Sequence, residues 1–88
     1  MAITTNHITV AATATKIATI SSGGATVFIT NTDASVTVYI GGSAVTTSIG
    51  FQLLAGQVFS DTFAPGENVY GIVSTGTLVV HYFMNEAL

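Results

Sequence analysis

The clearest strand signal in this 88-residue sequence is the stretch Thr77-Leu78-Val79-Val80-His81-Tyr82-Phe83. Leu78, Val80 and Tyr82 occupy alternate positions, and the other set of alternate positions carries a valine, a histidine and a phenylalanine, at 79, 81 and 83. Because successive side chains of a β-strand point to opposite faces of its sheet, this spacing predicts a strand with one apolar face and one mixed face.

The same alternation recurs in residues 25–30, 36–40 and 57–63. The first of these stretches places Val27 on the apolar face and Phe28, between two threonines, on the other face. A monomeric sandwich should show a cleaner division between apolar and polar faces. The aromatic or valine side chain on each polar face therefore indicates a second face that is partly buried, as an oligomer interface is.

Turn residues separate the predicted strands at intervals of about ten residues, which is typical of an all-β sandwich or barrel. The strands are expected at 15–20, 25–30, 36–40, 57–63, 68–73 and 77–83, with 7–12 as a candidate for one more. The β-branched excess of ten Val, eight Ile and fifteen Thr agrees with this fold class. We expect a single small antiparallel β-sandwich or barrel of about 6–8 short strands, with jelly-roll, immunoglobulin-like and barrel topologies left open.

Three further segments have their own predictions, and of these only 44–55 resists assignment to a strand or turn. Residues 1–14 contain no turn signal and are expected to form an N-terminal arm or a first strand, ahead of a β-sandwich domain at 15–88. Residues 44–55 are interpreted as a loop plugged by its own apolar side chains, with a short helical turn as an alternative. Ser74-Thr75-Gly76 is expected to form a hairpin turn with Gly76 in the left-handed region.

Charged side chains are scarce, since the sequence has one Lys, no Arg and four acidic residues, and hydrophobic residues make up 49%. This composition is opposite to that of disordered chains, and the absence of Cys excludes a disulfide scaffold. With Lys16 as the single base, neither nucleic acid nor an anionic membrane is an expected partner. The apolar runs are too short to span a membrane, and the N-terminal residues lack the pattern of a secretion signal.

So few charges predict that neighbouring chains cover part of the surface. The area scaling law gives a monomer of this length about 4,900 Å² of surface, or about 1,000 Å² for each charged side chain. We therefore expect a homo-oligomer or another stable assembly, the alternative being a monomer with a threonine-rich polar surface. The candidate interface residues, drawn from the mixed strands, are Phe28, Tyr39, Phe59, His81 and Phe83.

No catalytic, metal or cofactor site is expected. The two histidines, His7 and His81, are 74 positions apart, and no phosphate-binding loop or nucleophile motif is present. A lone strand histidine such as His81 is more often a packed or interface residue than a base. Asp61 lies between two phenylalanines in projection and is expected to mark a β-bulge that turns it outward, the alternative being an inward or interface carboxylate.

Four stretches carry a resemblance to a known group of proteins. They are Val38-Tyr39-Ile40-Gly41-Gly42-Ser43-Ala44-Val45-Thr46, Gly50-Phe51-Gln52-Leu53-Leu54-Ala55-Gly56, Val69-Tyr70-Gly71-Ile72-Val73-Ser74-Thr75-Gly76-Thr77 and Asn31-Thr32-Asp33. Over about residues 15–82 the chain resembles small structural proteins of tailed bacteriophages, with their strand ending V-Y-[IV]-G and their G-[FY]-x-L-x-x-G segment. A departure is the last strand, where many such proteins carry a basic residue and this chain has Val79-Val80-His81-Tyr82.

The resemblance implies a β-rich virion component, and some members of the group are head decoration proteins. The expected function is therefore that of a non-enzymatic virion structural protein, a capsid decoration or minor head protein that binds the shell exterior and self-associates. Its partners would be the major capsid protein or other virion proteins, and its location the virion, after synthesis in the host cytoplasm. The alternative is a tail, fibre or baseplate β-module that contacts the host or neighbouring virion proteins. An unrelated β-assembly or adhesion module is a third reading.

Overall fold

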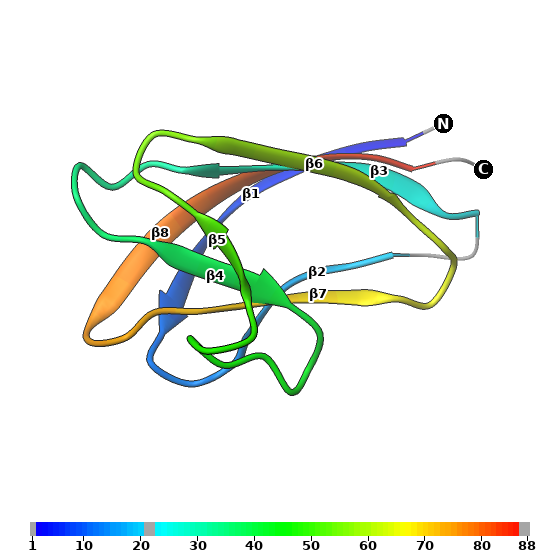
Figure 1. The fold of residues 1–88 in the computed structure, drawn as a ribbon. Coiled ribbons are helices and arrows are strands. Elements are labelled where there is room, and N and C mark those ends of the chain that lie inside the picture. Colours follow the sequence, from blue (N-terminus) through cyan, green and yellow to red (C-terminus); the bar gives the residue numbers. More distant parts are fainter. Residues whose placement is uncertain (1, 21–22, 87–88) are drawn as a thin grey trace.

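A computed structural model describes residues 2–20 and 23–86, and all the regular structure in these ranges is β-strand (Figure 1). The strands are β1 (Ala2–Ala11), β2 (Thr15–Thr19), β3 (Ala25–Asn31), β4 (Val38–Gly41), β5 (Phe51–Leu53), β6 (Val58–Phe63), β7 (Asn68–Ile72) and β8 (Thr77–Glu86). No helix long and apolar enough to cross a membrane occurs in the described ranges. The expected all-β fold with a strand count of six to eight is confirmed.

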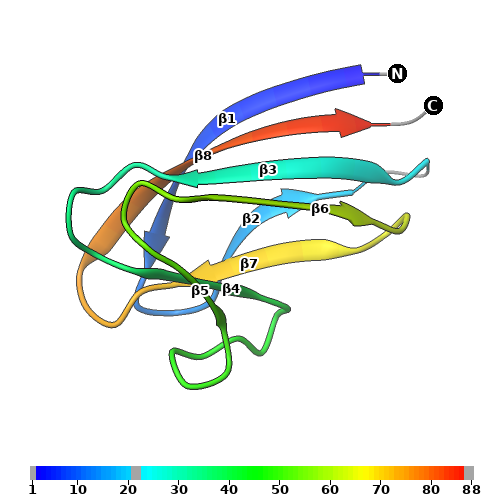
Figure 2. The same cartoon turned by 45° about the horizontal axis from the view of Figure 1, so that its top comes forward.

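The strands form two antiparallel sheets that pack as a sandwich (Figures 1 and 2). One sheet has the order β1-β8-β3-β6, and we name it the long-strand sheet; the other has the order β2-β7-β4-β5, and we name it the short-strand sheet. Among the connections between the described strands, only β4–β5 stays within one sheet. Of the topologies that the sequence left open, this order is that of a jelly roll, a double-sheet arrangement of eight strands.

The long-strand sheet is built around the pairing of β1 with β8. All ten residues of β1 have partners in β8, from Ala2 opposite Glu86 to Ala11 opposite Thr77. Both strands run the length of the molecule, and β1 forms one edge of the sheet (Figure 2). Of the two readings of the N-terminal segment, the structure therefore has residues 2–11 as a strand.

The core lies between the sheets and is formed by the apolar positions that alternate along the strands. In β3 and β8 the buried side chains include Val27, Ile29, Leu78 and Val80, and the side chains between them are more exposed. The face assignments made from the alternation in 25–30 and 77–83 are thus confirmed. The full core cluster consists of Val10, Ile17, Ala18, Ile20, Ala25, Val27, Ile29, Val38, Ile40, Leu53, Val69, Val73, Leu78, Val80 and Met84.

Asn31, at the end of β3, is the one polar residue among the buried residues of the described chain. Its Nδ2 group donates hydrogen bonds to the carbonyl oxygens of Val36, at 2.8 Å, and of Leu53, at 2.9 Å. Its Oδ1 atom accepts a bond from the N–H of Asp33 at 3.0 Å. This side chain therefore ties the long-strand sheet to the loop before β4 and to β5. The expected turn at 31–35 is present and is stabilised by it.

The predicted strand at 36–40 begins later than expected, at Val38. The reason is that the backbone N–H and C=O groups of Val36 are hydrogen-bonded to side chains. Its N–H donates to Asp33 Oδ2, and its carbonyl oxygen accepts from Asn31. A residue whose backbone is bonded in this way has no groups left for a sheet neighbour.

The segment at 44–55 is partly a strand, which the sequence analysis did not predict. Residues 51–53 form β5, opposite β4. The expectation that apolar side chains of Gly50-Phe51-Gln52-Leu53-Leu54 plug this loop is wrong for Phe51 and Leu54, which are exposed, and Leu53 is buried as part of β5. The buried side chain of the loop itself is Val45. The loop packs closely on the short-strand sheet, because a Cβ atom at Gly50 would lie 2.6 Å from Tyr39 Cβ and 2.9 Å from Val45 Cγ2.

The hairpin expected at residues 74–76 is absent. Gly76 has a φ of 68°, so its left-handed conformation is confirmed. However, β7 and β8 lie in different sheets, and the turn carries the chain across the sandwich. The turn residues determine the local backbone, but they do not determine which strand becomes the neighbour of β8.

The β-bulge expected at Asp61 is also absent. The pairing of β3 with β6 is regular from Ala25 opposite Phe63 to Thr30 opposite Val58, and Asp61 lies opposite the buried Val27. Residues directly opposite each other in an antiparallel pair share a face, so Asp61 is on the core-facing side. The side chain is nevertheless exposed, because β6 is the edge strand of the long-strand sheet.

Candidate functional site

The outer face of the long-strand sheet is the candidate functional site, and we call it the outer face. The strand registers arrange its side chains in rows across β1, β8, β3 and β6. One row is Thr5, Phe83, Phe28 and Ser60, and the next is His7, His81, Thr30 and Val58. A third row is Ile3, Asn85, Thr26 and Thr62.

Large apolar side chains are exposed on the outer face from all four strands. Phe28 and Phe83 retain 41% and 40% of their accessible surface, Val79 retains 41%, and Val58 and Ile3 retain more than 60%. Solvent exposure of single apolar side chains is ordinary, but a contiguous set on one sheet is a feature of interaction sites.

The charged side chains of the protein lie away from the outer face. The five of them are Lys16 in β2, Asp33 in the loop before β4, Asp61 on the core-facing side of β6, Glu67 in the turn before β7 and Glu86 at the end of β8. The outer face is therefore made of threonine, serine, asparagine, histidine and apolar side chains. Depletion of charge together with enrichment of aromatic residues is characteristic of interface cores.

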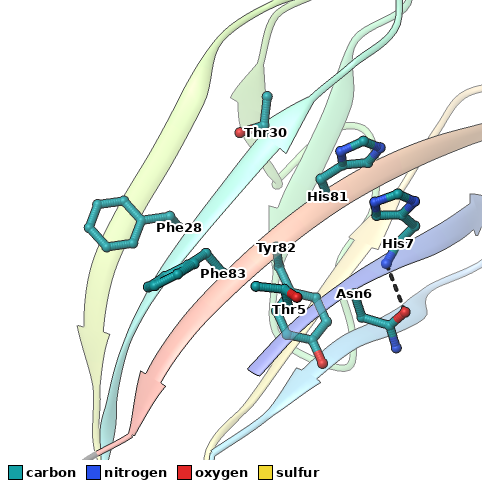
Figure 3. A pocket seen from close by; sticks show the side chains of 8 residues that line it. All are labelled: Thr5, Asn6, His7, Phe28, Thr30, His81, Tyr82 and Phe83. Atoms are coloured by element: carbon teal, nitrogen blue, oxygen red, sulfur yellow. Dashed lines mark hydrogen bonds between the residues drawn. The ribbon is translucent and has the colours of Figure 1, made fainter. Parts of the chain in front are cut away.

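On the β1 side of the outer face, two histidine rings stack across β1 and β8 (Figure 3). The ring centroids of His7 and His81 are 3.6 Å apart, and the ring planes differ by 5°. Asn6 supports β1 here, because its Oδ1 atom accepts the backbone N–H of His7 at 2.8 Å. His81 was predicted as a candidate interface residue and His7 was not, because their contact depends on the pairing of strands at opposite ends of the chain.

Phe28 and Phe83 pack next to the histidine pair. Their rings meet edge to face, with centroids 6.1 Å apart and an interplanar angle of 70°. Together with the histidines they surround a shallow hollow of about 260 Å³ (Figure 3). The residues that line it are Thr5, Asn6, His7, Phe28, Thr30, His81, Tyr82 and Phe83. This volume is below the ~300–1,000 Å³ of pockets that enclose a small molecule, so the outer face suits contact with a surface.

Three of the five candidate interface residues, Phe28, His81 and Phe83, thus lie together on the outer face. The other two lie elsewhere. Tyr39 is half-buried in the short-strand sheet, beneath the loop that contains Gly50. Phe59 is also half-buried and packs against the core at the side of the sandwich, where its ring meets that of Phe51 at 5.5 Å.

Apart from the stacked His7 and His81, the acidic and basic side chains are dispersed over the fold. Within residues 2–20 and 23–86, no group of three or more His, Cys, Asp or Glu side chains is placed to hold a metal ion. Asp33 has a structural part, because its Oδ2 atom accepts the backbone N–H groups of Ser35 at 2.9 Å and of Val36 at 2.8 Å. These hydrogen bonds, that of Ser35 first, lower the pKa of Asp33 below its ordinary value of 3.8.

Comparison with known proteins adds no family to this description. No protein family model matches the chain, and no curated protein matches it either.

Proposed function

We propose that this chain is a non-enzymatic structural protein of a virion, a capsid decoration or minor head protein that attaches to the shell exterior through the outer face. The observation that carries the proposal is the exposed, uncharged and aromatic surface around Phe28, Phe83 and the His7–His81 pair. The resemblance of the sequence to small structural proteins of tailed bacteriophages supplies the setting. The jelly-roll strand order agrees with it, because viral capsid domains use this architecture, although a fold alone does not determine a function.

The size of the outer face indicates how such a protein would attach. The four strands have 6 to 10 residues each and 33 in all, which at ~3.3 Å per residue and ~4.8 Å between strands give a flat footprint of about 520 Å². Each partner in a standard stable complex buries ~800 Å², so one outer face supports a weak contact. Many copies on a lattice, or an oligomer that binds several sites at once, would convert weak contacts into stable attachment.

The position of the charges supports an exterior location. The sequence has a formal net charge of −3 and a single base, Lys16. Packaged DNA would repel such a chain, whereas an uncharged outer face can pack on another protein without leaving a buried, unpaired charge.

The test compares two variants in particles of the virus that encodes the chain. Phe28→Ser removes an exposed aromatic side chain from the outer face. Ile49→Ser, the control, removes an aliphatic side chain that is 73% exposed in the loop between β4 and β5. We expect the number of copies per particle, measured by quantitative mass spectrometry, to fall severalfold for Phe28→Ser and to stay unchanged for Ile49→Ser. Normal occupancy of a folded Phe28→Ser variant, or absence of the wild-type chain from the particle, would contradict the proposal.

A second candidate function is that of a tail, fibre or baseplate module. The observation that favours it is the polar and aromatic lining of the hollow beside His7, His81 and Phe83, which resembles a surface for recognition of a host component. Electron cryo-microscopy of the particle separates the two functions. Hundreds of copies on the shell support decoration, and a few copies on the tail or at one vertex support the second candidate.

A further inference from the structure

The two sheets have four edge strands, and three of these carry features that hinder pairing with another chain. β5 is only three residues long. β2 contains Lys16 and an irregularity between Lys16 and Ala18. β6 carries Asp61 on its core-facing side. Short length, bulges, lysines and inward-pointing charges are the means by which β-proteins protect their edges.

The fourth edge strand, β1, has none of these features. It is ten residues long, its sequence is AITTNHITVA, and its pairing with β8 shows no register shift. It contains no charged residue, proline or glycine. Within the part of the chain that the structure describes, β8 is its one sheet neighbour. From Ile3 to Thr9 the other edge of β1 is therefore a regular and uncharged template for a further strand, whereas at Ala11 the N–H and C=O groups are already bonded to Thr15 and Val73.

Two hydrogen bonds show which backbone groups of β1 point to this free edge. The carbonyl oxygen of Ala11 accepts, at 3.1 Å, from the N–H of Val73, which lies outside β8. The N–H of His7 donates to the Asn6 side chain. Because backbone groups alternate in direction along a strand, the odd-numbered residues face the free edge, including Ile3, Thr5 and Thr9.

We propose that β1 pairs antiparallel with β1 of a second copy of this chain, about a two-fold axis perpendicular to the long-strand sheet. Registers that continue the outer face from one copy to the other place odd-numbered residues opposite odd-numbered residues. These are the residues whose N–H and C=O groups face the edge. The same registers therefore form hydrogen bonds between the two β1 strands and keep the two outer faces on one side of the joined sheet. Two sheets of four strands become one sheet of eight. The threonines and isoleucine of this face suit cross-strand packing.

The number of unprotected edges favours a second copy as the partner. A chain with one such edge forms a closed pair, because a two-fold contact uses that edge on both copies. Pairing of β1 with a different edge strand of the next copy would instead build an open-ended chain of copies. The features of β2, β5 and β6 that hinder pairing oppose such a chain. This inference deepens the proposed function, since it names the self-contact, but it concerns an edge rather than the outer face.

The first measurement uses the unmodified protein in solution. Sedimentation from about 1 µM to about 1 mM should show a monomer–dimer equilibrium. Over the same range, amide hydrogen exchange followed by NMR should show slower exchange of the Thr5 and Thr9 N–H groups as the dimer forms. A monomer at all concentrations, or a dimer in which these amides exchange as fast as in the monomer, overturns the inference.

The second measurement uses a matched pair of variants. Thr5→Pro removes an N–H group that faces the free edge and leaves the bonds to β8 intact, while Thr5→Ala shortens the side chain and keeps the N–H. With folding checked by circular dichroism, the dimer dissociation constant should rise about tenfold or more for Thr5→Pro and change little for Thr5→Ala. Equal dimerisation of both variants contradicts edge pairing. Because this assay contains no particle, its failure would leave attachment through the outer face standing.

Discussion

The two sheets of this sandwich differ in how far their outer surfaces are covered by the rest of the chain. The short-strand sheet has strands of three to five residues, and the loop between β4 and β5 packs on it over Tyr39. The long-strand sheet has strands of six to ten residues and no such cover within the described residues, although Phe28 and Phe83 are exposed there. One sheet is thus covered by its own chain, and the other presents the surface that we assign to a partner.

The largest effect is expected at Asn31, which joins the two sheets. Asn31→Ala removes the hydrogen bonds to Val36, Leu53 and Asp33, of which the bond to Leu53 is buried and the other two are partly buried. At ~1–3 kcal/mol for each unsatisfied buried group, we expect a loss of about 2–4 kcal/mol in the free energy of unfolding, measured by denaturant titration. The exposed Asn6→Ala is the matched control, with an expected change below about 0.5 kcal/mol. Equal stability of the two variants would contradict this role of Asn31.

A smaller effect is expected where the loop covers the short-strand sheet. Gly50→Ala introduces a Cβ atom 2.6 Å from Tyr39 Cβ and 3.0 Å from the Thr46 carbonyl oxygen, so the loop must move. Overpacking of this kind costs about 1–3 kcal/mol. Gly42→Ala is the control, because a Cβ atom there meets nothing within 4 Å. If thermal unfolding shows no difference between the two variants, the loop does not pack on the sheet as described.

The smallest effect concerns the turn that leads from the long-strand sheet to the short-strand sheet. Backbone hydrogen bonds lower the pKa of Asp33, so its carboxylate stabilises the folded state above the ordinary value of 3.8. This contribution is lost as the pH falls through the lower folded-state pKa. Thermal unfolding of Asp33→Asn should therefore depend less on pH below about 4 than that of the wild type, with Asp61→Asn as the control for loss of charge. Identical acid profiles for wild type and Asp33→Asn would contradict the assignment.

The sequence predicted the starts of β2, β3, β6, β7 and β8 to within one residue, but it missed β5 and gave β1 only as a candidate strand at 7–12. The alternation in 25–30 and 77–83 is long enough to show which side chains face the core, so the exposure of Phe28 and Phe83 followed from it. β5 has only three residues, too few for a period of two to be visible. Tyr39 was predicted at an interface from its place on a mixed strand, and the packing of the loop beside it is a contact that no local pattern shows.

Contacts between distant parts of the chain could not be predicted from local sequence patterns. His7 could not be placed with His81 before the pairing of β1 with β8 was known. Similarly, Gly76 was correctly expected in the left-handed region, yet the partner of the strand that follows it depends on the whole topology. Asp61 was expected to turn outward at a bulge, but the edge position of β6 leaves it exposed without one.

The most direct measurement is a density map of the intact particle, obtained by electron cryo-microscopy at a resolution that shows side chains. The account predicts that the chain lies on the shell exterior in many copies and that a neighbouring protein covers Phe28, Phe83 and the stacked histidines. It also predicts that the loop side of the short-strand sheet faces solvent. A map in which the outer face is open to solvent, while the other sheet or the sides of the sandwich make the attachment, would contradict the account.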